Sequence, residues 1–119
     1  MSRRIMIIDD DDTCMFLYKH HFRGFPGGEI IAEFDNAEDA LAQINQLKPD
    51  VVIVDYKLPG MSGIEFVERI SQYPEIRILL VTGHDRDYFK SMMKNPLKFD
   101  IVKKDWSEKT IEYILAFCK

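Results

Sequence analysis

The stretch that decides the fold reads Pro49-Asp-Val-Val-Ile-Val-Asp55-Tyr-Lys-Leu-Pro-Gly-Met-Ser-Gly63. Its run of β-branched and apolar residues from Val51 to Val54 predicts a strand buried on both faces, as the strands of parallel sheets are. Asp55 ends this run, and a Pro-Gly turn follows. Open α/β sheets bind ligands beyond the carboxyl ends of their strands, so Asp55 marks a candidate site. An isolated aspartate at such a position is more often a helix cap. The interpretation of Asp55 therefore depends on which residues end the other predicted strands.

Strand and helix patterns alternate on both sides of this stretch. Apolar runs predict four more strands, over residues 5–8, 29–34, 76–81 and 99–103, the last at a sheet edge. Helical spacing predicts five helices, over residues 12–23, 36–48, 64–73, 85–94 and 107–118. The expected N-caps are Asp12 or Thr13, Asn36 and Ser107. This order predicts one α/β domain, residues 1–119, with a doubly wound five-stranded parallel sheet and helices on both faces.

The composition is that of an ordinary soluble globular domain. The chain has 119 residues, of which 46% are hydrophobic and 30% charged, enough for one core. A net charge of -4 gives no reason to expect binding to nucleic acid or membrane by bulk attraction. Cys14 and Cys118 lie too far apart in sequence for a metal-ligand pair, and reduced thiols in a cytoplasmic protein are expected. No segment resembles a membrane span or a signal peptide.

Polar side chains end four of the five predicted strands. They are Asp9 and Asp10 after the first strand, Asp55 after the third, Thr82 after the fourth, and Lys103 or Lys104 after the fifth. Because the carboxyl ends of parallel strands meet at one edge, these positions form a single predicted site. Its carboxylates repel one another, and oxygen-only ligands favour Mg²⁺ over zinc. A hydroxyl and an ammonium beside such a metal indicate phosphoryl chemistry.

In these motifs the chain resembles the receiver domains of bacterial two-component response regulators, over essentially all of its length. The motifs are Ile7-Ile8-Asp9-Asp10-Asp11, Val54-Asp55-Tyr56-Lys57-Leu58-Pro59-Gly60-Met61-Ser62-Gly63, Val81-Thr82-Gly83 and Ile101-Val102-Lys103-Lys104-Asp105. Each signal is weak alone, and together they are specific in order and spacing. The resemblance implies a flavodoxin-like sheet with strand order 2-1-3-4-5.

The resemblance also implies a role for each position. Asp55 would attack the phosphohistidine of a sensor kinase or histidine phosphotransfer protein and become an aspartyl phosphate. Asp10 would bind Mg²⁺ directly, Asp9 through water, and the backbone carbonyl of Lys57 would supply another ligand. Thr82 and a lysine would hold the phosphoryl oxygens. The domain would catalyse its own phosphorylation and carry an autophosphatase activity.

The sequence departs from the family pattern near the predicted fifth strand. Alignment of the last motif makes Lys104 the phosphoryl-binding lysine, with Lys103 as the alternative. Ile101 stands where an aromatic switch residue is usual, so the conformational switch is expected to be muted or carried by loops and helices. Asp105 replaces the usual proline, which makes a cis peptide there costly. Trp106 is expected to fill the core, with a place on an output surface as the alternative. Ser62, in the acceptor loop, replaces a common aspartate.

Two side chains near Asp55 carry a further hypothesis. Lys57 lies two positions after the acceptor Asp55, where its ammonium is able to pair with a phosphoryl oxygen and to block the approach of water. This predicts slow autodephosphorylation, which Lys57→Ala should accelerate. An exposed loop lysine is an equally good interpretation. His84, two positions after Thr82, borders the same site or is an ordinary surface histidine.

Partners follow mainly from the resemblance. Met15, Phe16 and Tyr18 cannot all face the core, so an apolar edge of the first helix is expected near the site, where the family docks its kinase or phosphotransfer domain. Tyr88, Phe89, Met92, Met93 and Tyr113 are candidates for a signalling face. The expected output is a downstream protein target or a separate output domain, with no direct contact to nucleic acid or membrane.

Two other function classes stay open. Asp9-x-Asp11-x-Thr13 resembles the nucleophile motif of haloacid-dehalogenase-type phosphatases, but too little chain follows Lys104 for the acidic motif of that superfamily. The other class is a phosphorylation-independent interaction module on the same fold, which Ile101 favours and the complete acidic pocket disfavours.

Overall fold

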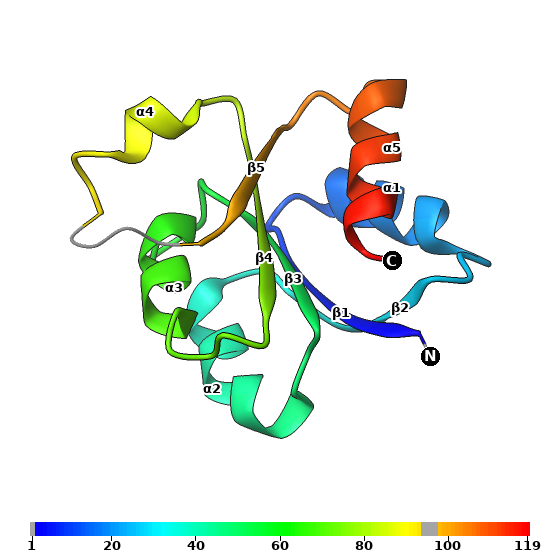
Figure 1. Cartoon of the computed structure of the whole chain (residues 1–119), viewed down its shortest axis with the longest axis horizontal. Coiled ribbons are helices and arrows are strands. Elements are labelled where there is room, and N and C mark those ends of the chain that lie inside the picture. Colours follow the sequence, from blue (N-terminus) through cyan, green and yellow to red (C-terminus); the bar gives the residue numbers. More distant parts are fainter. Residues whose placement is uncertain (1, 94–97) are drawn as a thin grey trace.

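The computed structural model describes residues 2–93 and 98–119, and within them strands alternate with helices (Figure 1). The strands are β1 (Arg3–Ile8), β2 (Gly28–Phe34), β3 (Val51–Asp55), β4 (Arg77–Thr82) and β5 (Asp100–Lys103). The helices are α1 (Asp12–Phe22), α2 (Ala37–Leu47), α3 (Gly63–Ile70), α4 (Arg86–Phe89) and α5 (Glu108–Phe117).

The strands form one parallel sheet in the order β2-β1-β3-β4-β5, which confirms the predicted topology. β3 lies at the centre and all of its residues are buried, as its β-branched run requires. β5 lies at an edge and is only partly covered. The register pairs Asp55 with Val81 and Thr82 with Lys103, which brings the ends of β3, β4 and β5 to one level.

Alternate side chains of the strands enter two hydrophobic cores. Met6, Val52 and Leu80 face α2, α3 and the buried Phe89 of α4. Ile5, Ile53 and other strand residues on the opposite face pack against α1 and α5. Figure 1 shows this division, with α2 and α3 on one side of the sheet and α1 and α5 on the other. Among the described residues, none of the helices combines the length and apolar character that a membrane span needs.

The fourth helix differs most from its prediction over residues 85–94. It comprises Arg86–Phe89, and the N–H groups of Met92 and Met93 bond to the Phe89 carbonyl in a turn. Phe89 is fully buried, whereas Tyr88 and Met92 are 41% and 37% exposed. With one buried anchor, little packing holds a further helical turn. The predicted end at Lys94 lies outside the described residues.

The remaining differences are at element ends. Asp11, rather than Asp12 or Thr13, caps α1, because its side chain accepts a hydrogen bond from the Cys14 N–H at 3.0 Å. α3 ends at Ile70 and not at Tyr73, whose N–H bonds to the Ile70 carbonyl in the turn before Pro74. Four strands also differ from their predicted ends, since β1 begins at Arg3, β2 begins at Gly28, β4 covers Arg77–Thr82 and β5 begins at Asp100. The ends of α1, α2 and α5 differ by one residue. The caps at Asn36 and Ser107 are confirmed.

Candidate functional site

The predicted site residues lie together at the carboxyl edge of the sheet. Asp9 directly follows β1, Asp55 ends β3, Thr82 ends β4 and Lys104 directly follows β5. The Lys104 N–H donates to the Thr82 carbonyl at 3.2 Å, which ties the end of β5 to the end of β4. Parallel topology thus gathers residues that are far apart in the chain.

Lys104 is the cation at the centre of this site. Its Nζ donates a hydrogen bond to Asp55 Oδ2 at 2.7 Å and lies 3.1 Å from Asp9 Oδ2. Burial alone would lower the pKa of Lys104, but the hydrogen bonds and charges of Asp55 and Asp9 outweigh burial and raise it above its usual range. Lys103, one position earlier, is exposed. Because adjacent residues of a strand point to opposite sides, only Lys104 reaches the carboxylates.

Asp9 is the most deeply buried carboxylate of the site, at 2% exposure. Its Oδ1 accepts a hydrogen bond from the Asp11 N–H at 2.9 Å. Burial raises the pKa of Asp9, and the opposing effects of the Asp11 N–H and of Lys104 do not cancel that rise. The ionised form of Asp9 therefore costs stability in the folded protein.

Asp9→Asn is expected to increase the free energy of unfolding of the metal-free protein at pH 7, on the order of 1 kcal/mol. A raised pKa means that the folded state binds a proton more tightly than the unfolded state, so the cost of Asp9 falls as pH decreases through that pKa. The advantage of Asn should thus shrink on acidification. Urea unfolding in EDTA at several pH values measures it, and an advantage that grows toward acidic pH would contradict the argument.

Three carboxylates converge on one point. Asp9, Asp10 and Asp55 each offer one oxygen, and these oxygens all lie within 4.8 Å of one another. Asp9 and Asp55 are buried and Asp10 is exposed. An oxygen-only donor set with a solvent-facing member suits a hard divalent cation that keeps part of its water, as Mg²⁺ does. These carboxylates therefore fit the predicted Mg²⁺. The role of the Lys57 backbone carbonyl as a further metal ligand stays a prediction.

A cavity of about 300 Å³ opens beside Asp55. Thr82, Lys104 and the exposed Lys57 line it, together with Tyr56, Gly83 and His84. Thr82 is buried, and its Oγ1 accepts a hydrogen bond from the His84 N–H at 3.2 Å. The cavity brings a hydroxyl and two lysines beside one carboxylate.

Sequence reasoning missed an aromatic cluster at this cavity, which we call the Tyr56 cluster and which consists of Tyr56, His84, Tyr88 and Phe89. The His84 and Tyr88 rings stack with centroids 3.7 Å apart, and Tyr56 contacts Phe89 edge-on at 4.9 Å. The cluster joins the loop after β3 to α4. His84 and Tyr88 follow i, i+4 spacing, but no local pattern pairs either with Tyr56.

The loop after Asp55 is held by specific contacts. Gly60 has a φ of +74°, the left-handed conformation that the second residue of a Pro-Gly turn takes. The Met61 N–H donates to Glu38 Oε2 of α2 at 2.9 Å. Ser62 caps α3, since its side chain accepts from the Glu65 N–H. Ser62 thus keeps the capping capacity of the aspartate that is common there.

β5 and the segment that follows it show how the sequence departures are accommodated. Ile101 is half-buried against the core on the α2 and α3 face. Asp105 accepts hydrogen bonds from the Ser107 N–H at 3.0 Å and Thr110 Oγ1 at 2.7 Å, and these lower its pKa. Trp106 is half-buried, in partial agreement with its prediction as core, and contacts Tyr18 edge-on at 4.7 Å.

Cys14 and Cys118 are buried free thiols.

Comparisons with known proteins agree with this geometry. Residues 5–116 match the family model of the response regulator receiver domain. The response regulator GacA of Pseudomonas viridiflava is 29% identical over 91 residues, covering 76% of this chain and 42% of GacA. A protein-glutamate methylesterase/protein-glutamine glutaminase of Agrobacterium fabrum is 34% identical over 80 residues, covering 67% of this chain and 23% of that protein. The chain therefore spans less than half the length of these curated relatives.

Solved structures share the fold. The signal receiver domain of NarL from Mycobacterium tuberculosis superposes with a TM-score of 0.80 at 23% identity, covering 98% of this chain and 95% of that chain. A LuxR-family DNA-binding response regulator from Staphylococcus aureus gives a TM-score of 0.78 at 28% identity, covering 98% and 99%. The family match spans the site from the acidic pair to the lysine, and this chain belongs to the response regulator receiver domain family of two-component signalling.

Proposed function

We propose that this receiver domain accepts a phosphoryl group on Asp55 from a phosphohistidine and changes conformation as a result. The observation that carries this proposal is the position of Asp55 at the end of β3, with Lys104 Nζ at 2.7 Å and two further carboxylates within 4.8 Å. Phosphoryl transfer needs mainly positioning and charge stabilisation, and this arrangement supplies both.

In the proposed reaction, a carboxylate oxygen of Asp55 attacks phosphorus as the bond from phosphorus to the histidine nitrogen breaks. The imidazole leaves with its electron pair and takes a proton from solvent. Lys104, which holds the Asp55 carboxylate in place, donates a charge-assisted hydrogen bond to a phosphoryl oxygen. Thr82 lines the same cavity, and its hydroxyl donates a hydrogen bond to a second phosphoryl oxygen. Attack of water on phosphorus then breaks the bond to the Asp55 oxygen, which releases inorganic phosphate and returns the carboxylate.

The acidic trio of Asp9, Asp10 and Asp55 would hold Mg²⁺. When bound, the ion would neutralise negative charge on the phosphoryl oxygens. Asp10 is the exposed member and remains our proposed direct ligand, with Asp9 acting through water and the Lys57 carbonyl as a further ligand. The Lys57 side chain is exposed and lines the cavity, which is consistent with slow autodephosphorylation. Lys57→Ala is therefore expected to lose its phosphoryl group faster than wild type.

Intact-mass measurement after incubation with phosphoramidate and Mg²⁺ tests this function. Wild type is expected to gain one phosphoryl adduct, Asp55→Asn none, and Asp9→Asn the same adduct more slowly. Without Mg²⁺ the adduct should be absent. An adduct that persists in Asp55→Asn but disappears in Asp9→Asn would instead support the phosphatase chemistry of Asp9.

Mg²⁺ should also stabilise the fold, because it binds a site that the unfolded chain lacks. At ten times the dissociation constant, the free energy of unfolding is expected to rise by about 1.4 kcal/mol. Asp10→Asn should lose most of this gain while keeping a melting temperature close to wild type in EDTA. Thermal melts with and without millimolar Mg²⁺ measure both effects, and identical wild-type melts would remove the metal site.

The proposed phosphodonor is a sensor histidine kinase or a histidine phosphotransfer protein. The expected apolar edge of α1 is present, since Phe16 is 64% exposed there, four residues into the helix that begins beside the acidic trio. Tyr88, Met92 and Tyr113 are exposed candidates for contact with a downstream protein or an output domain, whereas Phe89 belongs to the core. We place this signalling in the cytoplasm, without direct contact to nucleic acid or membrane.

A phosphorylation-independent interaction module is the second candidate function. Ile101 favours it, because an isoleucine half-buried in the core cannot make the inward swing of an aromatic switch residue. The intact-mass experiment separates the two functions. Absence of an adduct on every variant and on wild type would support the module.

A further inference from the structure

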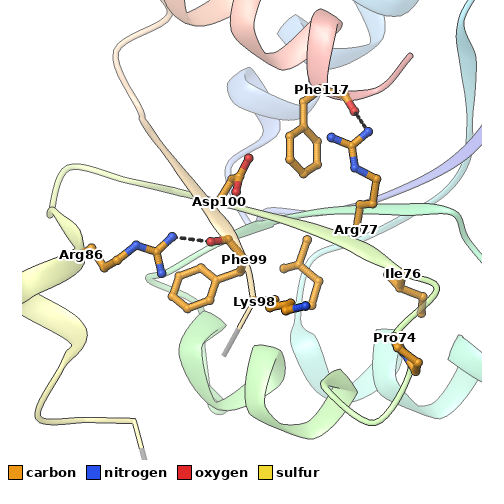
Figure 2. Close-up of a pocket in the computed structure, with 9 residues that line it drawn as sticks. Pro74, Ile76, Arg77, Arg86, Lys98, Phe99, Asp100 and Phe117 are labelled. Carbon is orange, nitrogen blue, oxygen red and sulfur yellow. Dashed lines mark hydrogen bonds between the residues drawn. The ribbon is translucent and has the colours of Figure 1, made fainter. Parts of the chain in front are cut away.

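A cavity of about 480 Å³ lies where β4 and β5 begin, at the end of the sheet opposite to Asp55 (Figure 2). Its apolar lining comes from Pro74, Ile76, Ile78, Phe99 and Phe117. Three exposed cationic residues, Arg77, Arg86 and Lys98, border it together with Asp100. A volume of this size suits a ligand much larger than a single inorganic anion.

Two arginines of the cavity are held in fixed positions, one on each side of β5. The Arg77 guanidinium lies over the Phe117 ring at 4.3 Å and donates to the Phe117 carbonyl at 2.8 Å. The Arg86 guanidinium lies over the Phe99 ring at 4.6 Å and bonds to the Phe99 carbonyl. Figure 2 shows the two pairs on either side of β5, with dashed lines from each guanidinium to its carbonyl. Each planar guanidinium keeps further N–H donors, and its stacking lowers the entropy lost on binding.

The positive charge of this cavity has no internal partner in the described part of the chain. No carboxylate there lies within ion-pair distance of Arg77, Arg86 or Lys98. The Asp100 carboxylate instead accepts a hydrogen bond from Tyr113 Oη at 3.0 Å. In a protein of net charge -4, such a local excess of cations favours an acidic ligand.

The backbone beside the cavity adds a second recognition element. Lys98, Phe99 and Asp100 lead from the cavity into β5, which has β4 on one side and, within residues 2–93 and 98–119, no strand on the other. An edge strand offers N–H and C=O groups to an added extended chain. A free carboxylate or phosphate uses only the arginines, whereas an extended peptide also fills the apolar lining and pairs with the edge.

We propose that this cavity binds an extended acidic segment of a partner protein. Carboxylates of the segment pair with Arg77 and Arg86, its apolar side chains contact Phe99 and Phe117, and its backbone adds to the free edge of β5. The interaction is separate from the acceptor site, because none of its residues lines the cavity beside Asp55.

Fluorescence anisotropy tests the proposal with a labelled peptide that alternates valine with glutamate. Unphosphorylated wild type is expected to bind it at low salt, and Arg77→Gln/Arg86→Gln to bind it at least about tenfold more weakly. The matched control is Arg23→Gln/Arg69→Gln, which removes the same charge from exposed positions outside the cavity. In nitrogen-15 spectra, the peptide should shift the amide signals of β5.

A second pair of variants guards against misfolding of the arginine variant. Lys98 is exposed and forms no ion pair in the described chain, so Lys98→Glu is expected to weaken peptide binding without lowering the melting temperature. Lys109→Glu, on α5 outside the cavity, carries the same charge change and should bind as wild type does.

Four outcomes would overturn the proposal. They are no binding by wild type, equal affinity for a valine-glutamine peptide, equal losses in the cavity and control variants, and displacement of the peptide by inorganic phosphate at low millimolar concentration. The last outcome would identify a site for small anions. Peptide affinity is measured without phosphorylation, so failure here leaves the proposed function of Asp55 untouched.

Discussion

Lys104→Met is expected to lower the free energy of unfolding by about 2–3 kcal/mol at pH 7 in EDTA, at or just below the roughly 3–5 kcal/mol cost of removing one partner from a fully buried ion pair. Lys104 Nζ lies 2.7 Å from Asp55 and 3.1 Å from Asp9, and both carboxylates are buried. Without the ammonium, two negative charges face each other with little water. Because 22% of the Lys104 side chain is exposed, we expect less than the full cost of a completely buried pair.

The pH dependence of this loss has a definite sign. Because the pKa of Lys104 is raised in the folded state, the stability that its charge contributes is fully present below the ordinary pKa of lysine and is lost only as pH rises from there through the raised pKa. Asp9, whose pKa is already raised, should bind a proton still more tightly without Lys104. The difference between Lys104→Met and wild type should therefore shrink as pH falls from 7 into the acidic range.

Urea unfolding at several pH values measures this difference, with Lys103→Met as the matched control. Lys103 is exposed, so its replacement should change stability by no more than about 0.5 kcal/mol. In an Asp9→Asn background, Lys104→Met should cost less, because one of the two facing charges is gone. Equal losses in Lys103→Met and Lys104→Met would contradict the central place of Lys104.

The choice between these two lysines shows what the sequence predicts and where structure is needed. The parallel sheet and the common edge of Asp9, Asp55 and Thr82 follow from the alternation of strands and helices, whereas the strand order was implied by the family resemblance, and the structure agrees with both. Whether Lys103 or Lys104 reaches the carboxylates depends on a one-residue register at the end of β5. Motif alignment favoured Lys104, but an edge strand with partly covered residues has no apolar alternation that fixes the register.

Features that depend on contacts between distant segments were not predictable. Trp106 adopts a φ of +53°, which is rare for a bulky residue. Trp106 contacts Tyr18 of α1, and no local sequence pattern predicts this contact. The short α4 and the Tyr56 cluster have the same origin, because Phe89 anchors α4 to the core while His84 and Tyr88 stack on each other and contact Tyr56 edge-on. Tertiary packing, and not local propensity, fixes these parts.

Gly63→Ala is expected to lower the free energy of unfolding by about 3 kcal/mol, because the added methyl group would overlap backbone atoms that cannot move aside separately. A Cβ at this position would overlap the Asp55 carbonyl oxygen and lie 2.8 Å from Tyr56 Cα. The Gly63 N–H also donates to the Tyr56 carbonyl at 2.8 Å. The first turn of α3 is thus pressed against the end of β3, where Asp55 lies.

Relief of this overlap requires α3 to move away from β3. Ile64, Phe66, Val67 and Ile70 of α3 are all buried, so such a shift opens the core on that face or displaces the Asp55 backbone. We therefore expect slower phosphoryl uptake from phosphoramidate as well as lower stability. Both effects have one cause, the close approach that a glycine allows at the start of α3.

Gly83→Ala is the matched control, because Gly83 lines the cavity beside Asp55 but a Cβ there would meet no atom within 4 Å. Its replacement should change the free energy of unfolding by less than about 0.5 kcal/mol. Urea unfolding of both variants, together with intact-mass time courses, measures the contrast. Similar losses from the two substitutions would mean that loop entropy rather than steric overlap governs both glycines. A large loss in Gly63→Ala alone would identify the contact between α3 and β3 as the element that couples the core to the acceptor aspartate.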